Sequence, residues 1–252
     1  MMRIDINACF GHWQYWDLHH KTSDQLVGLM DRNGIDSAAV LSLRGPFLHW
    51  RDGNTETLEA AKAHPGRLIP MATVSPFTGG DGDALRRLAD AGMRGVRLYP
   101  RLHSYDLGDA FVDDIFRTAT DLGWPVVIPT RPMMNWRFAA LPLDAIGSVV
   151  DRHPQTQIVV SGPNYLVEFQ GMVRLMKRAA NVWYEISCLQ GFNAVSRLVG
   201  EVGADRVLFG TGAVLNYPAC NVEKLDHADL TDAQRAAIAG ANAARLLGLA
   251  VG

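Results

Sequence analysis

The chain has 252 residues, of which 48% are hydrophobic and 20% charged, so it can bury a sizeable core and is unlike a disordered protein. Its 24 lysines and arginines are balanced by 26 aspartates and glutamates, which excludes binding to nucleic acids or anionic membranes through a large basic excess. No apolar run reaches the roughly 18 residues of a membrane span, the N-terminus becomes polar too soon for a secretory signal, and three scattered cysteines form no disulfide framework. We therefore expect a cytoplasmic protein with neither a nucleic-acid nor a membrane partner.

Short runs rich in β-branched residues recur along the chain and predict β-strands. There are eight of them, at residues 4–9, 37–43, 67–75, 95–99, 125–130, 157–161, 182–187 and 206–210. Between the runs, apolar residues recur with helical spacing, as Leu26, Leu29 and Met30 do in the first such stretch. Thr231 and Gln234 have the spacing of a capping box and predict the start of the last helix.

Eight strands that alternate with helices over about 250 residues predict an α/β fold, a closed (β/α)8 barrel or TIM barrel. The alternative is a doubly wound open sheet, which usually begins with a glycine-rich turn of the form G-x-G-x-x-G. The turn after the first strand is Phe10-Gly11-His12-Trp13 and lacks that pattern. No linker or low-complexity stretch interrupts the chain, so residues 1–252 are expected to form one domain.

In such a barrel the chemistry is found at the carboxyl ends of the strands and in the loops that follow them. His64 and His153 precede predicted strands, which predicts a structural or solvent-exposed role at the opposite end. Five histidines fall in segments at the functional end: His12, His19, His20, His49 and His103.

Five segments, in this order along the chain, carry a resemblance to a known family. They are residues 2–9 (MRIDINAC), 92–100 (GMRGVRLYP), 122–130 (LGWPVVIPT), 203–212 (GADRVLFGTG) and 236–249 (AAIAGANAARLLGL). Together they resemble the amidohydrolase-related family, a branch of the metal-dependent hydrolase superfamily that also includes decarboxylases.

The resemblance implies a metal site with His-x-His on strand 1, a histidine at the ends of strands 5 and 6, and an aspartate after strand 8. The corresponding residues here are Asn7-Ala8-Cys9, Pro129-Thr130, Ser161-Gly162 and Gly210-Thr211-Gly212. A zinc centre needs about three or four donors, and these positions do not supply them. We therefore expect no cofactor and no metal ligand at the family positions. A divalent metal held by relocated ligands, such as Cys9 and the loop histidines, is the alternative.

Alternation along the strands places Arg97 and Tyr99 on the inner face of strand 4, and Glu185 on the inner face of strand 7. A buried carboxylate must be paired or protonated, and Arg97 is the expected partner of Glu185. One interpretation is a structural ion pair. The other is that Arg97 binds a substrate anion while Glu185 acts as a general base.

The same loops are rich in arginines and aromatic residues. The arginines are Arg44, Arg97, Arg101, Arg131 and Arg137, and guanidinium groups suit small anionic ligands. The aromatic residues are Trp13, Tyr15, Trp16, Phe47, Trp50, Tyr105, Trp136 and Phe138. They predict a ligand pocket, a lid that packs on itself, or a subunit interface.

These patterns favour an enzyme, an atypical amidohydrolase-related hydrolase or a decarboxylase or other lyase. It would act without the family metal centre on a small anionic substrate, for which an aromatic compound is one candidate. The predicted catalytic residues are Glu185, His103, His12 and Cys9, and the predicted substrate-binding residues are Arg97, Tyr99, Arg131, Asn7, Arg44 and Trp136. Cys9 is a nucleophile in one interpretation and a buried core cysteine in the other. The alternative function is a non-catalytic ligand-binding or scaffold protein, and a homo-oligomer stays open.

Overall fold

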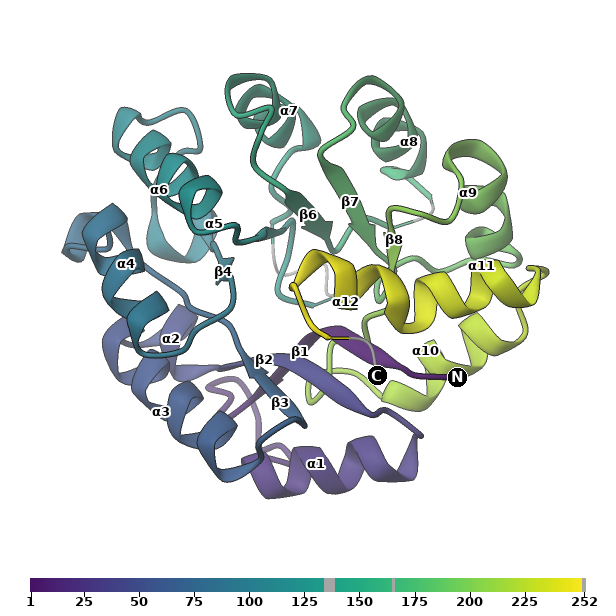
Figure 1. Cartoon of the computed structure of the whole chain (residues 1–252), viewed down its shortest axis with the longest axis horizontal. Coiled ribbons are helices and arrows are strands. Elements are labelled where there is room, and N and C mark those ends of the chain that lie inside the picture. The colour runs from purple at the N-terminus through teal and green to yellow at the C-terminus, as the bar shows by residue number, and fades with distance from the viewer. Residues whose placement is uncertain (134–138, 165, 251–252) are drawn as a thin grey trace.

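The computed structural model describes residues 1–133, 139–164 and 166–250, and shows a ring of parallel strands surrounded by helices (Figure 1). The strands in these residues are β1 (Ile4–Phe10), β2 (Ser37–Ser42), β3 (Leu68–Pro70), β4 (Val96–Arg97), β5 (Val126–Pro129), β6 (Ile158–Ser161), β7 (Val182–Glu185) and β8 (Val207–Leu208). Within the described residues, no helix is both long enough and apolar enough to cross a membrane.

The helical elements surround this ring. They are α1 (Ser23–Arg32), α2 (Arg44–Phe47), α3 (Trp50–Ala63), η1 (Pro76–Thr78), α4 (Gly82–Asp90), α5 (Pro100–His103), α6 (Ala110–Asp121), α7 (Leu143–Arg152), α8 (Phe169–Arg178), α9 (Ala194–Val202), α10 (Pro218–Asp226), α11 (Asp232–Ala236), η2 (Ala237–Ala241) and α12 (Asn242–Leu246). The predicted capping box is present, because the Thr231 side chain accepts from the Gln234 backbone and the Gln234 side chain accepts from the Thr231 backbone.

The strands pair in the order β1-β2-β3 and β4-β5-β6-β7-β8, with every pairing parallel. Ala72 pairs with Val96 and joins the two groups, while the Ile6 amide donates to the Phe209 carbonyl at 3.0 Å and joins the last strand to the first. These contacts close the sheet, so the predicted (β/α)8 barrel is confirmed. The assigned strands are shorter than the predicted runs, although the ladder continues beyond them, as where the Leu98 amide donates to the Val127 carbonyl at 2.9 Å.

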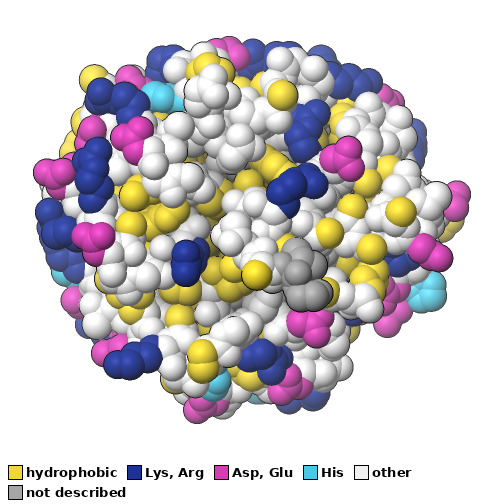
Figure 2. All heavy atoms as spheres, viewed as in Figure 1, with side chains coloured by type: hydrophobic (Ala, Val, Ile, Leu, Met, Phe, Trp, Pro, Cys, Tyr) yellow, Lys and Arg dark blue, Asp and Glu magenta, His cyan; other side chains and the backbone are white. Residues whose placement is uncertain are grey.

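The interior of the barrel is filled at one end. Ile6, Val127, Val159 and Leu208 belong to a buried apolar cluster that also includes Leu247, which follows α12. The helix α12 lies across the end of the barrel that faces the viewer, where the N-terminus also lies (Figure 1). Charged side chains of both signs are spread around the edge of this face, with apolar side chains nearer its centre (Figure 2). The carboxyl ends of the strands therefore form the opposite, functional end.

One glycine allows the chain ends to pack closely at this base. A Cβ atom on Gly240 in η2 would lie 2.6 Å from the backbone oxygen of Met2, closer than real Cβ atoms approach. The neighbouring Ile238 carbonyl accepts from the Phe209 amide at 3.0 Å. The last helical segment thus packs against the first strand and bonds to the residue that follows the last one.

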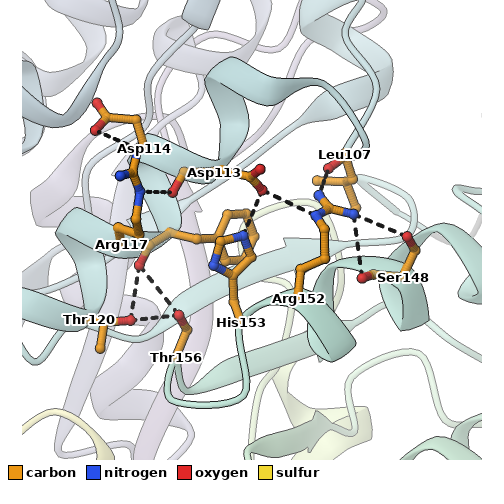
Figure 3. Close-up of polar contacts among 10 residues, drawn as sticks. Leu107, Asp113, Asp114, Arg117, Thr120, Ser148, Arg152, His153 and Thr156 are labelled. Carbon is orange, nitrogen blue, oxygen red and sulfur yellow. Dashed lines mark hydrogen bonds and ion pairs between the residues drawn. The ribbon is translucent and has the colours of Figure 1, made fainter.

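The two histidines predicted to be structural each contact an aspartate of a neighbouring helix. His64 Nε2 lies 2.7 Å from Asp24, and His153 Nε2 donates to Asp113 Oδ1 at 2.7 Å. The His153 ring also stacks on Phe116, with ring centroids 4.9 Å apart. Arg152 Nε donates to the same Asp113 oxygen at 3.2 Å, so this group fastens α6 to the end of α7 (Figure 3).

The contact between Asp113 and His153 predicts acid-dependent stability. The hydrogen bond from His153 lowers the pKa of Asp113, with a further contribution from Arg152. A lowered pKa in the folded state adds stability above the unfolded-state pKa, and this stability is lost as the pH falls through the folded-state pKa. At pH 7, Asp113→Asn should therefore lower the free energy of unfolding by about 1 kcal/mol, a value reduced by solvent screening.

Urea unfolding of the wild type and the variant across acidic pH measures this difference, which should vanish at low pH. Asp121→Asn is the matched control, because Asp121 lies on the same helix and makes only a 3.7 Å exposed contact with Arg86. A difference that is independent of pH would contradict the assignment.

Candidate functional site

Two carboxylates are buried in the polar network inside the barrel, and Asp5, the second residue of β1, is the first. Asp5 Oδ1 accepts from the Asn7 amide at 2.8 Å and from the Thr211 amide at 3.0 Å, and Oδ2 accepts from the Thr211 hydroxyl. Burial raises the pKa of Asp5 to about 6, although these hydrogen bonds lower it and therefore oppose the effect. Asp5 thus ties β1 to the loop after β8.

Glu185, at the end of β7, is the second buried carboxylate and is completely inaccessible to solvent. Its Oε2 accepts from Asn7 Nδ2 at 2.9 Å, from the Ser161 hydroxyl at 2.7 Å and from the Ser187 hydroxyl at 2.8 Å. Its Oε1 accepts from the Ser187 amide. All of these donors are neutral, and they come from β1, β6 and the end of β7.

The predicted pairing of Arg97 with Glu185 is wrong. Arg97 is buried and faces the interior as predicted, but its Nη1 donates to the Ala8 carbonyl at 3.3 Å and its Nη2 to the Ile6 carbonyl at 3.1 Å. Within the described residues Arg97 makes no ion pair, and its Nε has no hydrogen-bond partner. The register of β1 shifts between Asp5 and Ala8, and this irregularity presents carbonyl groups to the guanidinium.

A pocket of about 210 Å³ opens beside the ends of β4 and β5. Its lining combines apolar, aromatic and cationic side chains, and consists of Tyr99, Pro100, Arg101, Leu102, Pro129, Thr130, Arg131, Pro132 and Ala139. Arg131 is held by an ion pair with Glu168 at 2.5 Å. Arg101 is exposed and makes no ion pair among the described residues, so its guanidinium is available to an anion.

The pocket adjoins the buried carboxylates through neighbouring strands. The Thr130 amide donates to the Ser161 carbonyl at 2.7 Å, and the Ser161 hydroxyl donates to Glu185. The Thr130 hydroxyl is buried and has no hydrogen-bond partner among the described residues. The pocket therefore offers an available guanidinium on α5 and an unsatisfied hydroxyl after β5, and the inaccessible Glu185 carboxylate lies on β7, beyond Ser161 of the intervening strand β6.

Three other predicted catalytic residues are less well placed. Cys9 is buried, and burial raises its pKa to about 11, so the geometry favours the interpretation as a core cysteine. His12 is exposed in the loop after β1. His103 is partly buried on α5, where its Nδ1 donates to the Val74 carbonyl at 3.2 Å, and burial lowers its pKa. Their catalytic roles stay predictions.

The predicted binding residues fall into two groups. Tyr99 and Arg131 follow β4 and β5 and line the pocket, whereas Asn7 lies within β1 and joins the buried network. Arg44 instead pairs with Asp52 at 3.1 Å and with Glu56 at 3.0 Å near the surface. Trp136 and Arg137 lie outside the described residues.

Four of the aromatic loop residues, Trp13, Tyr15, Trp16 and Phe47, pack on one another, while Trp136 and Phe138 lie outside the described residues. Trp13 is buried, with its ring centroid 5.0 Å from those of Tyr15 and Phe47 and 5.4 Å from that of Trp16. This arrangement is that of a lid packing on itself, which was one of the three predicted interpretations.

Sequence reasoning missed several members of the network, namely Asp5, Ser161, Ser187, Thr211, Asn221 and Lys224 as polar partners. Ser187 could have been found, because alternation places it on the same face as Glu185. Asp5 lay in the segment that carried the family resemblance, but no sequence pattern indicated that it would pair with Thr211, which follows the last strand.

The raised pKa of Asp5 predicts a stability change of the opposite sign to that of Asp113. The folded state holds the Asp5 proton more tightly than the unfolded chain does, so the free energy of unfolding falls as the pH rises from the unfolded-state pKa to about 6. Asp5→Asn cannot ionise and should lack this decrease. The difference between the two proteins should change by roughly 3 kcal/mol across that interval, at about 1.4 kcal/mol for each pKa unit.

Urea unfolding at several pH values between 4 and 7 gives the two stability curves. Parallel curves for the wild type and the variant would show that Asp5 ionises as an ordinary aspartate.

Solved structures of decarboxylases share this fold. The 2,6-dihydroxybenzoate decarboxylase from Rhizobium has a TM-score of 0.76 at 16% identity, covering 98% of both chains. The 5-carboxyvanillate decarboxylase from Sphingomonas paucimobilis has a TM-score of 0.76 at 14% identity, covering 99% of both chains. The 5-carboxyvanillate decarboxylase from Novosphingobium aromaticivorans, complexed with manganese, has a TM-score of 0.75 at 18% identity, covering 98% of this chain and 96% of that one.

The manganese in the Novosphingobium enzyme contradicts the prediction that no cofactor is expected. The prediction rested only on the substituted residues at the strand ends. Those residues are not sufficient evidence, because enzymes with this fold include ones that contain a metal. The residues described here do not, however, fit a site of that type. Among them, no group of three histidine, cysteine, aspartate or glutamate side chains could hold a metal ion, and Asn7 turns its amide nitrogen toward Glu185.

The sequence itself identifies the family. The amidohydrolase family profile matches residues 49–249, which is most of the chain. No curated protein matches the sequence. The profile match agrees with the barrel, with the resemblance carried by the five segments and with the shared fold of the decarboxylases. The chain therefore belongs to the amidohydrolase family.

Proposed function

We propose that this protein is a decarboxylase-type lyase that acts on a small aromatic carboxylate. The observation that carries the proposal is the pocket beside β4 and β5, which combines an available guanidinium with an apolar and aromatic lining. Pockets of this composition bind flat apolar ligands and use a few polar groups to orient them. The decarboxylases that share the fold act on 2,6-dihydroxybenzoate and 5-carboxyvanillate, both of which are single-ring acids.

The dimensions of the pocket support a substrate with one ring. Its volume of about 210 Å³ suits a single substituted ring rather than a larger fused system. Arg101 would bind the carboxylate, because a planar guanidinium matches a carboxylate with two parallel hydrogen bonds. Tyr99 and Leu102 would contact the ring, and the unsatisfied Thr130 hydroxyl would bind a polar substituent.

The proposed reaction breaks the bond between the ring carbon and the carboxyl carbon. Carbon dioxide leaves, and a proton replaces it on the ring carbon. Glu185 is the proposed acid–base residue, as the sequence predicted, and its carboxylate is held in one position by four donors. Proton transfer also requires that the group reach the reacting atom, directly or through one water molecule. Glu185 does not line the pocket, so in this proposal a water molecule relays the proton between Glu185 and the substrate.

The test is a panel of single-ring aromatic acids, with and without ring hydroxyls, assayed for carbon dioxide release. Each reaction is run with and without added manganese, because a related enzyme was crystallised with that ion. Arg101→Met should raise the KM or Kd for the acid by about 10- to 100-fold, the equivalent of a charged hydrogen bond. Arg86→Met is the control, because Arg86 lies on α4 in surface ion pairs with Asp83 and Asp121.

Equal loss in both arginine variants, or no binding of any acid to the wild type, would refute the assignment of the pocket. Glu185→Gln keeps most of the shape of the side chain and should abolish turnover while leaving the acid bound.

A non-catalytic ligand binder is the second candidate. The observation that favours it is that protein donors already satisfy both oxygens of Glu185, as they would for a purely structural carboxylate. Such a binder would raise its melting temperature with an aromatic acid but release no carbon dioxide. Either function has a small-molecule partner, and assembly into a homo-oligomer stays a prediction.

A further inference from the structure

Two side chains of α10 reach across the loops that follow β7 and β8. Lys224 Nζ donates to the Ile186 carbonyl at 2.6 Å, to the Ser187 carbonyl at 3.3 Å and to Asn221 Oδ1 at 2.6 Å. Asn221 Nδ2 donates in turn to the Thr211 carbonyl at 3.0 Å. All the donors of the ammonium are used, and one helix thus holds the backbone of two different loops.

The residues held in this way are the donors to the two buried carboxylates. Ser187 donates both its amide and its hydroxyl to Glu185, and Thr211 donates both its amide and its hydroxyl to Asp5. In each loop, α10 holds the carbonyl of one residue, and the amide and hydroxyl of that same residue donate to a carboxylate. Without the α10 contacts, both loops would be free to move, and the hydrogen bonds that Ser187 and Thr211 donate to the buried carboxylates would weaken.

The ammonium also supplies charge. Lys224 makes no ion pair within 4 Å among the described residues, and the ionisable groups around it are Glu185, Cys188 and Cys220. Burial lowers the pKa of Lys224 to about 8, and the negative charge of Glu185 opposes that decrease. Lys224 is consequently charged near neutral pH, and it titrates just above it. A lysine that only filled space would have no influence on Glu185.

We propose that Lys224, acting with Asn221, is a positioning residue that fixes the hydrogen-bond donors of Glu185 and Asp5 and provides the nearby positive charge. The inference rests on the proposed function only in regarding Glu185 as part of a catalytic site. The coupling between α10 and the two carboxylates is a property of the folded protein without substrate, so it can be measured separately from activity.

The experiment is two-dimensional amide NMR of the 15N-labelled full chain, following the Ser187 and Thr211 amide protons. In Lys224→Met, both protons should shift upfield, because their hydrogen bonds to the carboxylates lengthen. In Asn221→Ala, the Thr211 proton should shift more than the Ser187 proton. Lys177→Met is the control, because Lys177 pairs with Glu201 on the surface, and it should leave both signals unchanged.

A pH titration of the protein that retains Lys224 gives a second readout, for which Lys224→Met is the comparison. The Ser187 amide proton should titrate with a midpoint near pH 8, and this titration should be absent from Lys224→Met. A Cys220→Ser background removes the exposed thiol beside the lysine, while the Cys188 pKa of about 11 lies well above this range.

The two readouts separate the possible outcomes. Unchanged Ser187 and Thr211 signals in folded Lys224→Met, or no titration of Ser187 near pH 8, would overturn the inference. If Lys224→Met does not fold, Asn221→Ala and the titration still decide it. Failure of every aromatic acid to bind would remove the proposed function and leave this coupling intact.

Discussion

A buried carboxylate without water must find hydrogen-bond donors, and the functional end of this barrel is arranged around that requirement. Glu185 is inaccessible to solvent and accepts four hydrogen bonds, all from neutral groups. An unpaired buried charge would cost several kcal/mol. Ser161 and Ser187 lie on or beside the neighbouring strands β6 and β7, whereas Asn7 lies on β1, so the full set of donors forms only when the sheet is closed.

Asp5 is the second buried carboxylate whose hydrogen bonds require the barrel to be closed. Thr211 follows the last strand and donates twice to an aspartate of the first strand. The site and the seam of the barrel are therefore made of the same contacts. Substitutions among these polar residues affect stability and the geometry of the site together, and for this reason readouts such as pH dependence and amide shifts are needed to tell the two apart.

Periodicity predicted the parts of this structure that depend on local sequence. The barrel, the inward orientation of Arg97 and Glu185, and the last capping box all follow from patterns within a few residues. The partner of Arg97 could not be predicted in this way, because the register of β1 shifts and offers backbone carbonyls instead of a carboxylate. Lys224 was missed because it lies beyond a loop whose path no periodic pattern describes. The cofactor prediction failed for another reason. It was drawn only from the residues at the expected metal-ligand positions, and it did not take account of metal binding among proteins with this fold.

The packing of Gly240 against the Met2 backbone bears on how the barrel is made in a cell. During synthesis β1 emerges before the segment from η2 to α12, yet this segment packs against β1 and bonds to Phe209, the residue after β8. Until β8 emerges, the first strand has one open edge, and until α12 emerges the apolar cluster inside the barrel is not covered at this end. Domains fold as units during synthesis. The nascent chain therefore stays an incomplete barrel until α12 has emerged, and until β8 has emerged the open edge of β1 is the segment that a chaperone would need to shield.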